Sequence, residues 1–76
     1  MNIIYEILAE LRPEFDYRNS KDFIQDGLLD SFDIISLVSE LEEKYDILID
    51  ALDIVPENFC SVEAIASMVR KNGGNP

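Results

Sequence analysis

Three stretches of this 76-residue chain place apolar residues at the spacing of a helix with one buried face. The first covers residues 2–12 and stops before Pro13, which disfavours helical geometry at the residue preceding it. The second runs from about Ser31 to Tyr45, and the third follows Ser61 as its N-cap and ends at Gly73-Gly74. The expected buried positions are, helix by helix, Ile3, Ile4, Ile7, Leu8 and Leu11; Ile34, Leu37, Val38, Leu41 and Tyr45; and Val62, Ile65, Ala66 and Val69.

The longest connection, residues 13–30, follows no sustained period. Two short apolar groups, Phe15 with Tyr17 and Phe23 with Ile24, are expected to pin it against the helices as a long ordered loop. Irregular stretches of this length are unusual inside small domains and are more often functional than not.

Residues 46–60 have a mixed character. Ile47 and Ile49 are expected to face inward, and Pro56 is expected to open a short helical turn through Phe59. No stretch alternates in the manner of a strand. The sequence therefore predicts an all-α fold, a small antiparallel four-helix bundle made of three main helices and one short helix.

The length predicts a single domain over residues 1–76, with a flexible tail over about 72–76. The lone cysteine, Cys60, cannot form a disulfide within the chain, which is typical of a reducing cytoplasm. The first residues carry Glu6 and Glu10 and no basic leader, so we expect neither a signal peptide nor membrane insertion. We expect a cytoplasmic monomer.

The charge of the chain excludes several classes of function. Six basic and sixteen acidic residues leave a net charge of −10, and there is no histidine. Nucleic acids and anionic lipids would repel such a chain, and zinc sites and general-base catalysis usually depend on histidine or clustered cysteine. We therefore expect no enzyme, no resident metal and no nucleic-acid partner.

The acidic residues concentrate in one part of the chain. Residues 21–50 hold nine acidic and two basic residues, a net charge of −7. Such a surface is either a solvated helix face or a docking face for a basic partner, because a local field of one sign steers association. The sequence leaves both interpretations open.

Ser31 is the candidate reactive residue. It follows Asp30, a predicted N-cap that forms a weak capping box with Asp33, and it lies beside the outward-facing apolar side chains of Phe32 and Ile35. Without a histidine to activate it, Ser31 is a poor nucleophilic catalyst. A helix N-terminus favours a phosphate group, however, so the hydroxyl suits the attachment of a phosphodiester. The alternative is an ordinary helix-start serine.

The stretch Gly27-Leu28-Leu29-Asp30-Ser31-Phe32, followed by an acidic amphipathic helix, resembles the phosphopantetheine attachment motif of acyl carrier proteins. The signature of that family is Asp-Ser-Leu at the start of the second helix. The resemblance extends over nearly the whole chain, in length, acidity, helix order, the long first loop and the LEEKYDILID run after the motif.

The resemblance implies a carrier rather than an enzyme. A phosphopantetheinyl transferase would use coenzyme A to attach 4′-phosphopantetheine to Ser31, assisted by Asp30 and by a magnesium ion held with the transferase. The thiol of this arm would carry acyl or aminoacyl groups as thioesters between loading and transferring enzymes that dock through basic patches.

The resemblance also implies two sets of supporting residues. The expected partner contacts are Phe32, Asp33, Ile35, Ser36, Ser39, Glu40 and Glu43. The expected acyl-chain pocket is lined by Ile34, Val38, Leu41 and Ile49, for which ordinary core packing is the alternative.

Three departures from the family pattern leave the pathway open. Phe32 stands in place of the usual leucine, and the residues around it are close to those of D-alanyl carrier proteins. Ser36 stands where fatty-acid carriers often have an acid, and the segment 51–59 is longer and more apolar than their third helix. The cargo can thus belong to fatty acid biosynthesis, to polyketide or nonribosomal peptide synthesis, or to D-alanyl transfer. A different alternative is an acidic helical adaptor without a prosthetic group.

Overall fold

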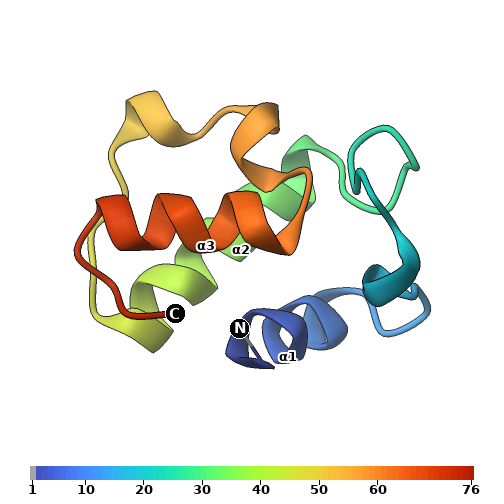
Figure 1. The fold of residues 1–76 in the computed structure, drawn as a ribbon, viewed down its shortest axis with the longest axis horizontal. Helices are drawn as coiled ribbons and strands as arrows, with labels where there is room; N and C mark the ends of the chain where they lie inside the picture. Colours follow the sequence, from blue (N-terminus) through green and yellow to red (C-terminus); the bar gives the residue numbers. More distant parts are fainter. Residues whose placement is uncertain (1) are drawn as a thin grey trace.

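The computed structural model describes residues 2–76, which form three α-helices joined by irregular segments that contain short 3-10 turns (Figure 1). The α-helices are α1 (Asn2–Leu11), α2 (Ser31–Tyr45) and α3 (Val62–Lys71), and the 3-10 turns are η1 (Tyr17–Asn19), η2 (Ala51–Asp53) and η3 (Pro56–Phe59). No strand occurs among the residues described. The all-α expectation is confirmed.

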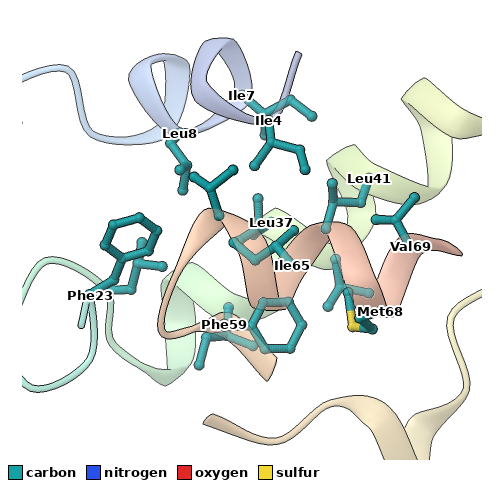
Figure 2. Packing of buried hydrophobic residues seen from close by; sticks show 14 of the residues in the cluster. Ile4, Ile7, Leu8, Phe23, Leu37, Leu41, Phe59, Ile65, Met68 and Val69 are labelled. Atoms are coloured by element: carbon teal, nitrogen blue, oxygen red, sulfur yellow. The ribbon is translucent and has the colours of Figure 1, made fainter. Parts of the chain in front are cut away.

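A single hydrophobic core lies where the three helices meet. Helix α1 packs against both α2 and α3, and Figure 2 shows Ile4 and Ile7 of α1, Leu37 of α2 and Ile65 of α3 converging on the same space. The stripes expected on the second and third helices are buried, apart from the half-buried Tyr45. Burial of this continuous apolar surface is the main stabilising contribution to so short a chain.

One predicted core position is wrong. The side chain of Ile3 is 43% exposed, whereas Ile4, Ile7 and Leu8 are almost fully buried. Successive helical residues are about 100° apart around the axis, so Ile3 lies at the edge of the buried stripe formed by Ile4, Ile7 and Leu8. Leu11, at the other end of α1, is half-buried.

The long loop over residues 13–30 is ordered by aromatic packing and backbone hydrogen bonds, as expected. The ring of Tyr17 meets those of Phe15 and Phe23 edge to face, with centroid distances of 6.3 and 5.3 Å. The amide of Phe23 donates to the carbonyl of Cys60 at 2.7 Å, and the carbonyl of Phe23 accepts from Leu29 at 3.2 Å. Phe23 therefore joins the loop to the start of α3 and holds the segment that leads into α2.

The connection from α2 to η3 is held to both neighbouring helices. The chain leaves α2 through Asp46, whose φ of 54° is left-handed, and the Ile49 amide then donates to the Glu42 carboxylate at 2.9 Å. The side chain of Ile49 is buried, as expected, whereas that of the preceding Leu48 is 85% exposed. Further along the chain, η3 is a single 3-10 turn that begins at Pro56, as the sequence predicts for this proline.

The first residues after α3 turn back onto the fold. Gly73 has a φ of 95°, which reverses the chain, and the amide of Gly74 donates to the carbonyl of Val69 at 2.8 Å. The start of the predicted tail thus closes the last turn of α3.

Candidate functional site

Ser31 is the first residue of α2, and its side chain is exposed. The helix begins with a complete capping box: the amide of Asp33 donates to Asp30 Oδ1 at 2.9 Å, and the amide of Asp30 donates to Asp33 Oδ2 at 3.3 Å. These reciprocal bonds satisfy two amides that a helix start would otherwise leave unpaired. The predicted cap is confirmed, and it fixes the backbone on both sides of Ser31.

The structure corrects the expected role of Asp33 as an exposed partner contact. Asp33 is only 7% exposed. Besides its part in the capping box, its Oδ1 accepts a hydrogen bond from Arg12 Nε at 3.2 Å. The third position of a capping box turns its side chain back toward the chain that precedes the helix, so this acid faces the protein and not a partner.

Arg12 is the residue that sequence reasoning missed. It lies just after α1, and its guanidinium reaches Asp33 as well as Asp30 Oδ2 at 4.0 Å and Glu14 Oε2 at 3.6 Å. The only signal in the sequence was a lone cation close to Pro13, because Arg12 and Asp33 are 21 positions apart. Such a pairing depends on how the first loop folds.

The electrostatics of the site keep the Asp30 carboxylate charged. The hydrogen bond from the Asp33 amide is the main reason that the pKa of Asp30 lies below its usual value, and the nearby Arg12 adds to the effect. In turn, the hydrogen bond to Asp33 raises the pKa of Arg12. The side chain of Asp30 is 63% exposed, so its carboxylate is accessible to solvent at the residue that precedes the exposed Ser31.

The other expected contact residues of α2 are exposed or half-buried. Phe32 and Ile35 are 77% and 65% exposed, which is unusual for large apolar side chains so near each other. Ser39 and Glu43 are exposed as well, whereas Ser36 and Glu40 are half-buried. The structure thus brings an exposed serine, an ionised carboxylate and an apolar surface together at one end of α2.

The residues expected to line an acyl-chain pocket belong to the hydrophobic core. Ile34, Val38, Leu41 and Ile49 are all buried. Two surface hollows of about 450 and 230 Å³ are lined by other residues, mainly of α1, the first loop and η3. The four side chains therefore pack as ordinary core in this structure.

A second buried acid, also missed from the sequence, lies away from Ser31. Asp53 of η2 is 6% exposed, and its carboxylate accepts from Lys71 Nζ at 2.7 Å and from Asn72 Nδ2 at 3.2 Å. These hydrogen bonds are the main cause that lowers the pKa of Asp53. The amide of Asp50 also donates to Asn72 Oδ1, at 3.2 Å. Together these bonds fasten the segment 46–54 to the end of α3.

Comparison of the chain with models of known protein families gives no match. Neither a search of curated proteins nor a search of solved structures gives a significant match. Within residues 2–76, no helix is long and apolar enough to cross a membrane. In the same part of the chain, no group of three or more acidic or cysteine side chains is arranged to hold a metal ion.

Proposed function

We propose that this protein is a carrier of acyl or aminoacyl groups, held as thioesters on a 4′-phosphopantetheine arm attached to Ser31. The observation that supports the proposal best is the start of α2, where the exposed Ser31 directly follows Asp30, whose side chain is 63% exposed and whose pKa is lowered. The resemblance of residues 27–32 to the attachment motif of acyl carrier proteins points to the same serine.

The site fits the phosphate of such an arm. The first turn of α2 places the positive end of its dipole beside Ser31, which stabilises an added phosphodiester. In the attachment reaction, the Ser31 hydroxyl displaces the nucleotide part of coenzyme A from the pantetheine phosphate, and its proton passes to a base. Asp30 assists in that step. The arm, when attached, supplies the thiol on which thioesters form.

The fold also suits a carrier. In this proposal, the three α-helices and η3 correspond to the main and short helices of an antiparallel four-helix bundle. A small rigid body with one exposed attachment point can present the same arm to several enzymes, and the carrier itself needs no catalytic base.

In this proposal, partner enzymes contact the exposed residues of α2 and its N-cap. Phe32 and Ile35 supply apolar contact area, Ser39 a polar contact, and Asp30 and Glu43 the negative charge that basic patches recognise. The phosphopantetheinyl transferase is the first such partner, and the loading and transferring enzymes follow. We propose that the carrier acts as a cytoplasmic monomer, with its cargo class left open among fatty acid, polyketide, peptide and D-alanyl pathways.

The test is an intact mass measurement after incubation with coenzyme A, Mg²⁺ and a transferase of broad specificity. The wild-type protein should gain the mass of one phosphopantetheine. Ser31→Ala should gain none, whereas Ser67→Ala, a matched change at an exposed serine of α3, should gain the same mass as the wild type.

Two results would contradict the proposal. A mass gain in Ser31→Ala would mean that another residue is modified. No gain in the wild type with several transferases would favour the acidic adaptor instead, because the exposed Phe32 and Ile35 beside acidic residues could bind a basic partner without any prosthetic group.

A further inference from the structure

Two carboxylates begin α2, and they are held in different ways. Asp30 and Asp33 exchange hydrogen bonds with each other's backbone amides. The side chain of Asp30 is nevertheless 63% exposed, whereas that of Asp33 is 11% exposed. Like charges confined to one helical turn disfavour each other, and a buried carboxylate needs a compensating partner.

Arg12 supplies that compensation, and it does so unequally. Its Nε donates to Asp33 Oδ1 at 3.2 Å, while its Nη2 remains 4.0 Å from Asp30 Oδ2, beyond hydrogen-bond distance. The guanidinium is thus committed to the buried acid. The outer oxygen of Asp30, Oδ2, therefore lies outside hydrogen-bond distance of Arg12, on a side chain that is 63% exposed.

We propose that Arg12 is a positioning residue for the attachment site. By neutralising Asp33, it keeps the capping box closed around Ser31 and leaves the outer oxygen of Asp30 free to assist the reaction. This inference rests on the proposed function of Ser31 and extends it by separating a structural acid from a functional one.

Loss of the guanidinium would act on Ser31 through Asp33. Without Arg12, the Asp33 carboxylate is a buried charge with no cation, so we expect it to turn toward solvent. If it turns outward, the amide of Asp30 loses its acceptor, and the first turn of α2 loosens at the residue before Ser31. A small displacement of a reacting group is enough to slow a transfer reaction strongly.

The test compares phosphopantetheine transfer to the wild type, Arg12→Gln, Arg12→Lys and the double variant Arg12→Gln/Asp33→Asn. All rates are measured below the melting temperature of every variant. Arg12→Gln should lower the turnover rate by roughly tenfold or more, with the KM for the carrier little changed. Arg12→Lys should recover part of the rate, because it restores the charge without the guanidinium geometry.

The double variant tests whether Arg12 acts on the attachment site through Asp33. The carboxamide introduced by Asp33→Asn has a carbonyl that can still accept from the Asp30 amide, and it carries no buried charge. The rate should therefore return to within about threefold of the wild type. Arg70→Gln, an equal charge change in the last turn of α3, should behave like the wild type. If Arg12 instead contacts the transferase, the loss will appear in KM and Asp33→Asn will not restore it, which would overturn the inference.

The outcomes also separate this inference from the proposed function. A wild-type protein that gains no mass contradicts the carrier function, and the role of Arg12 at an attachment site with it. If the wild type is modified, and Arg12→Gln is modified at the same rate, only the inference about Arg12 is contradicted. Amide hydrogen exchange on the unmodified protein adds a further measurement. Arg12→Gln should reduce protection at the Asp30 amide, which loses its bond to Asp33 Oδ2, and not at Ala64, whose amide is bonded to the Ser61 cap. Unchanged protection at Asp30 would contradict the proposed mechanism.

Discussion

The two buried aspartates of this protein are paired in similar ways but serve different structural ends. Asp33 lies at the start of α2 and pairs with Arg12, and Asp53 lies in η2 and pairs with Lys71. In each pair, the cation comes from a distant part of the chain at the end of another helix. Both acids are therefore tertiary anchors, although each sits in a short, polar stretch of sequence.

The difference lies in what each anchor leaves exposed. The Asp33 anchor closes a helix cap and leaves the hydroxyl of Ser31 in solvent. The Asp53 anchor draws the segment 46–54 onto α3, so that Ile49 is buried while Leu48 remains outside. The same interaction thus frames an open site at one end of α2 and covers the core at the other. The comparison implies that damage to the second anchor should reduce stability without affecting Ser31.

The largest expected effect is that of Ile49→Ala. Truncation of this buried side chain removes an apolar anchor of the segment 46–54 and should lower the free energy of unfolding by about 2–4 kcal/mol. Leu48→Ala, its exposed neighbour, should change it by less than about 0.5 kcal/mol. Denaturant titration measures both values. Equal losses in the two variants would mean that the segment does not cover the core as described.

The next largest effects are expected from alanine substitutions at two glycines, Gly74 after α3 and Gly27 before α2. A Cβ added at Gly74 would collide with Cγ1 of Val69, so Gly74→Ala should destabilise the fold by about 1–3 kcal/mol. A Cβ at Gly27 meets no atom within 4 Å, but the φ of this residue is 75°, so Gly27→Ala should cost only about 1 kcal/mol. Thermal unfolding can rank them. If Gly27→Ala were the more destabilising substitution, the chain after α3 would be able to move away from Val69 at little cost in free energy.

Asp53→Asn and Asp33→Asn should differ in their effect on modification. Asp53→Asn weakens the bond to Lys71 and should lower the melting temperature by a few degrees, with no change in the rate at which Ser31 is modified. Asp33→Asn frees the Arg12 guanidinium to move onto the outer oxygen of Asp30, and it should slow modification severalfold. Calorimetry and mass-based kinetics check the two effects. A slowed reaction in Asp53→Asn would show that the two ends are coupled.

The smallest predicted effect is a dependence on pH. Because the folded-state pKa of Asp53 is lowered, its ionised form contributes stability above the ordinary value of 3.8, and this contribution is lost as the pH falls through the folded-state pKa. The stability difference between the wild type and Asp53→Asn should therefore be constant from pH 7 to 5 and shrink below about pH 4. Denaturant titration over this range provides the measurement. A difference that stays constant as the pH falls well below 3.8 would exclude the ion pair as its origin.

The parts of the fold that the sequence predicts well are those with local causes. The stripe of α2 and the caps at Asp30 and Ser61 depend on residues three or four positions apart, and all three are found as expected. The exposure of Phe32 follows from the same periodicity. Ser31 could be proposed as the candidate site for this reason.

The features that the sequence does not predict depend on distant contacts. As an acidic residue in the first turn of an acidic helix, Asp33 would be expected at the surface. Its burial is explained by its pairing with Arg12, which lies 21 residues away in the sequence. The pairing of Asp53 with Lys71 spans 18 residues and is equally invisible to a periodic pattern. Charged side chains become buried where folding brings an opposite charge to them, and no short window of sequence contains both partners.

The hydrogen bond between the amide of Phe23 and the carbonyl of Cys60 has a consequence for biosynthesis. It closes a stretch of chain that contains the whole of α2, so the loop leading to Ser31 cannot reach its final position until Cys60 has left the ribosome. Closing so long a loop costs chain entropy before the contact is gained, which favours its formation late in folding. The loop that leads to Ser31 thus reaches its final position only once the chain as far as Cys60 is available, and a nascent chain that ends before Cys60 would be a poor substrate for any enzyme that reads this site.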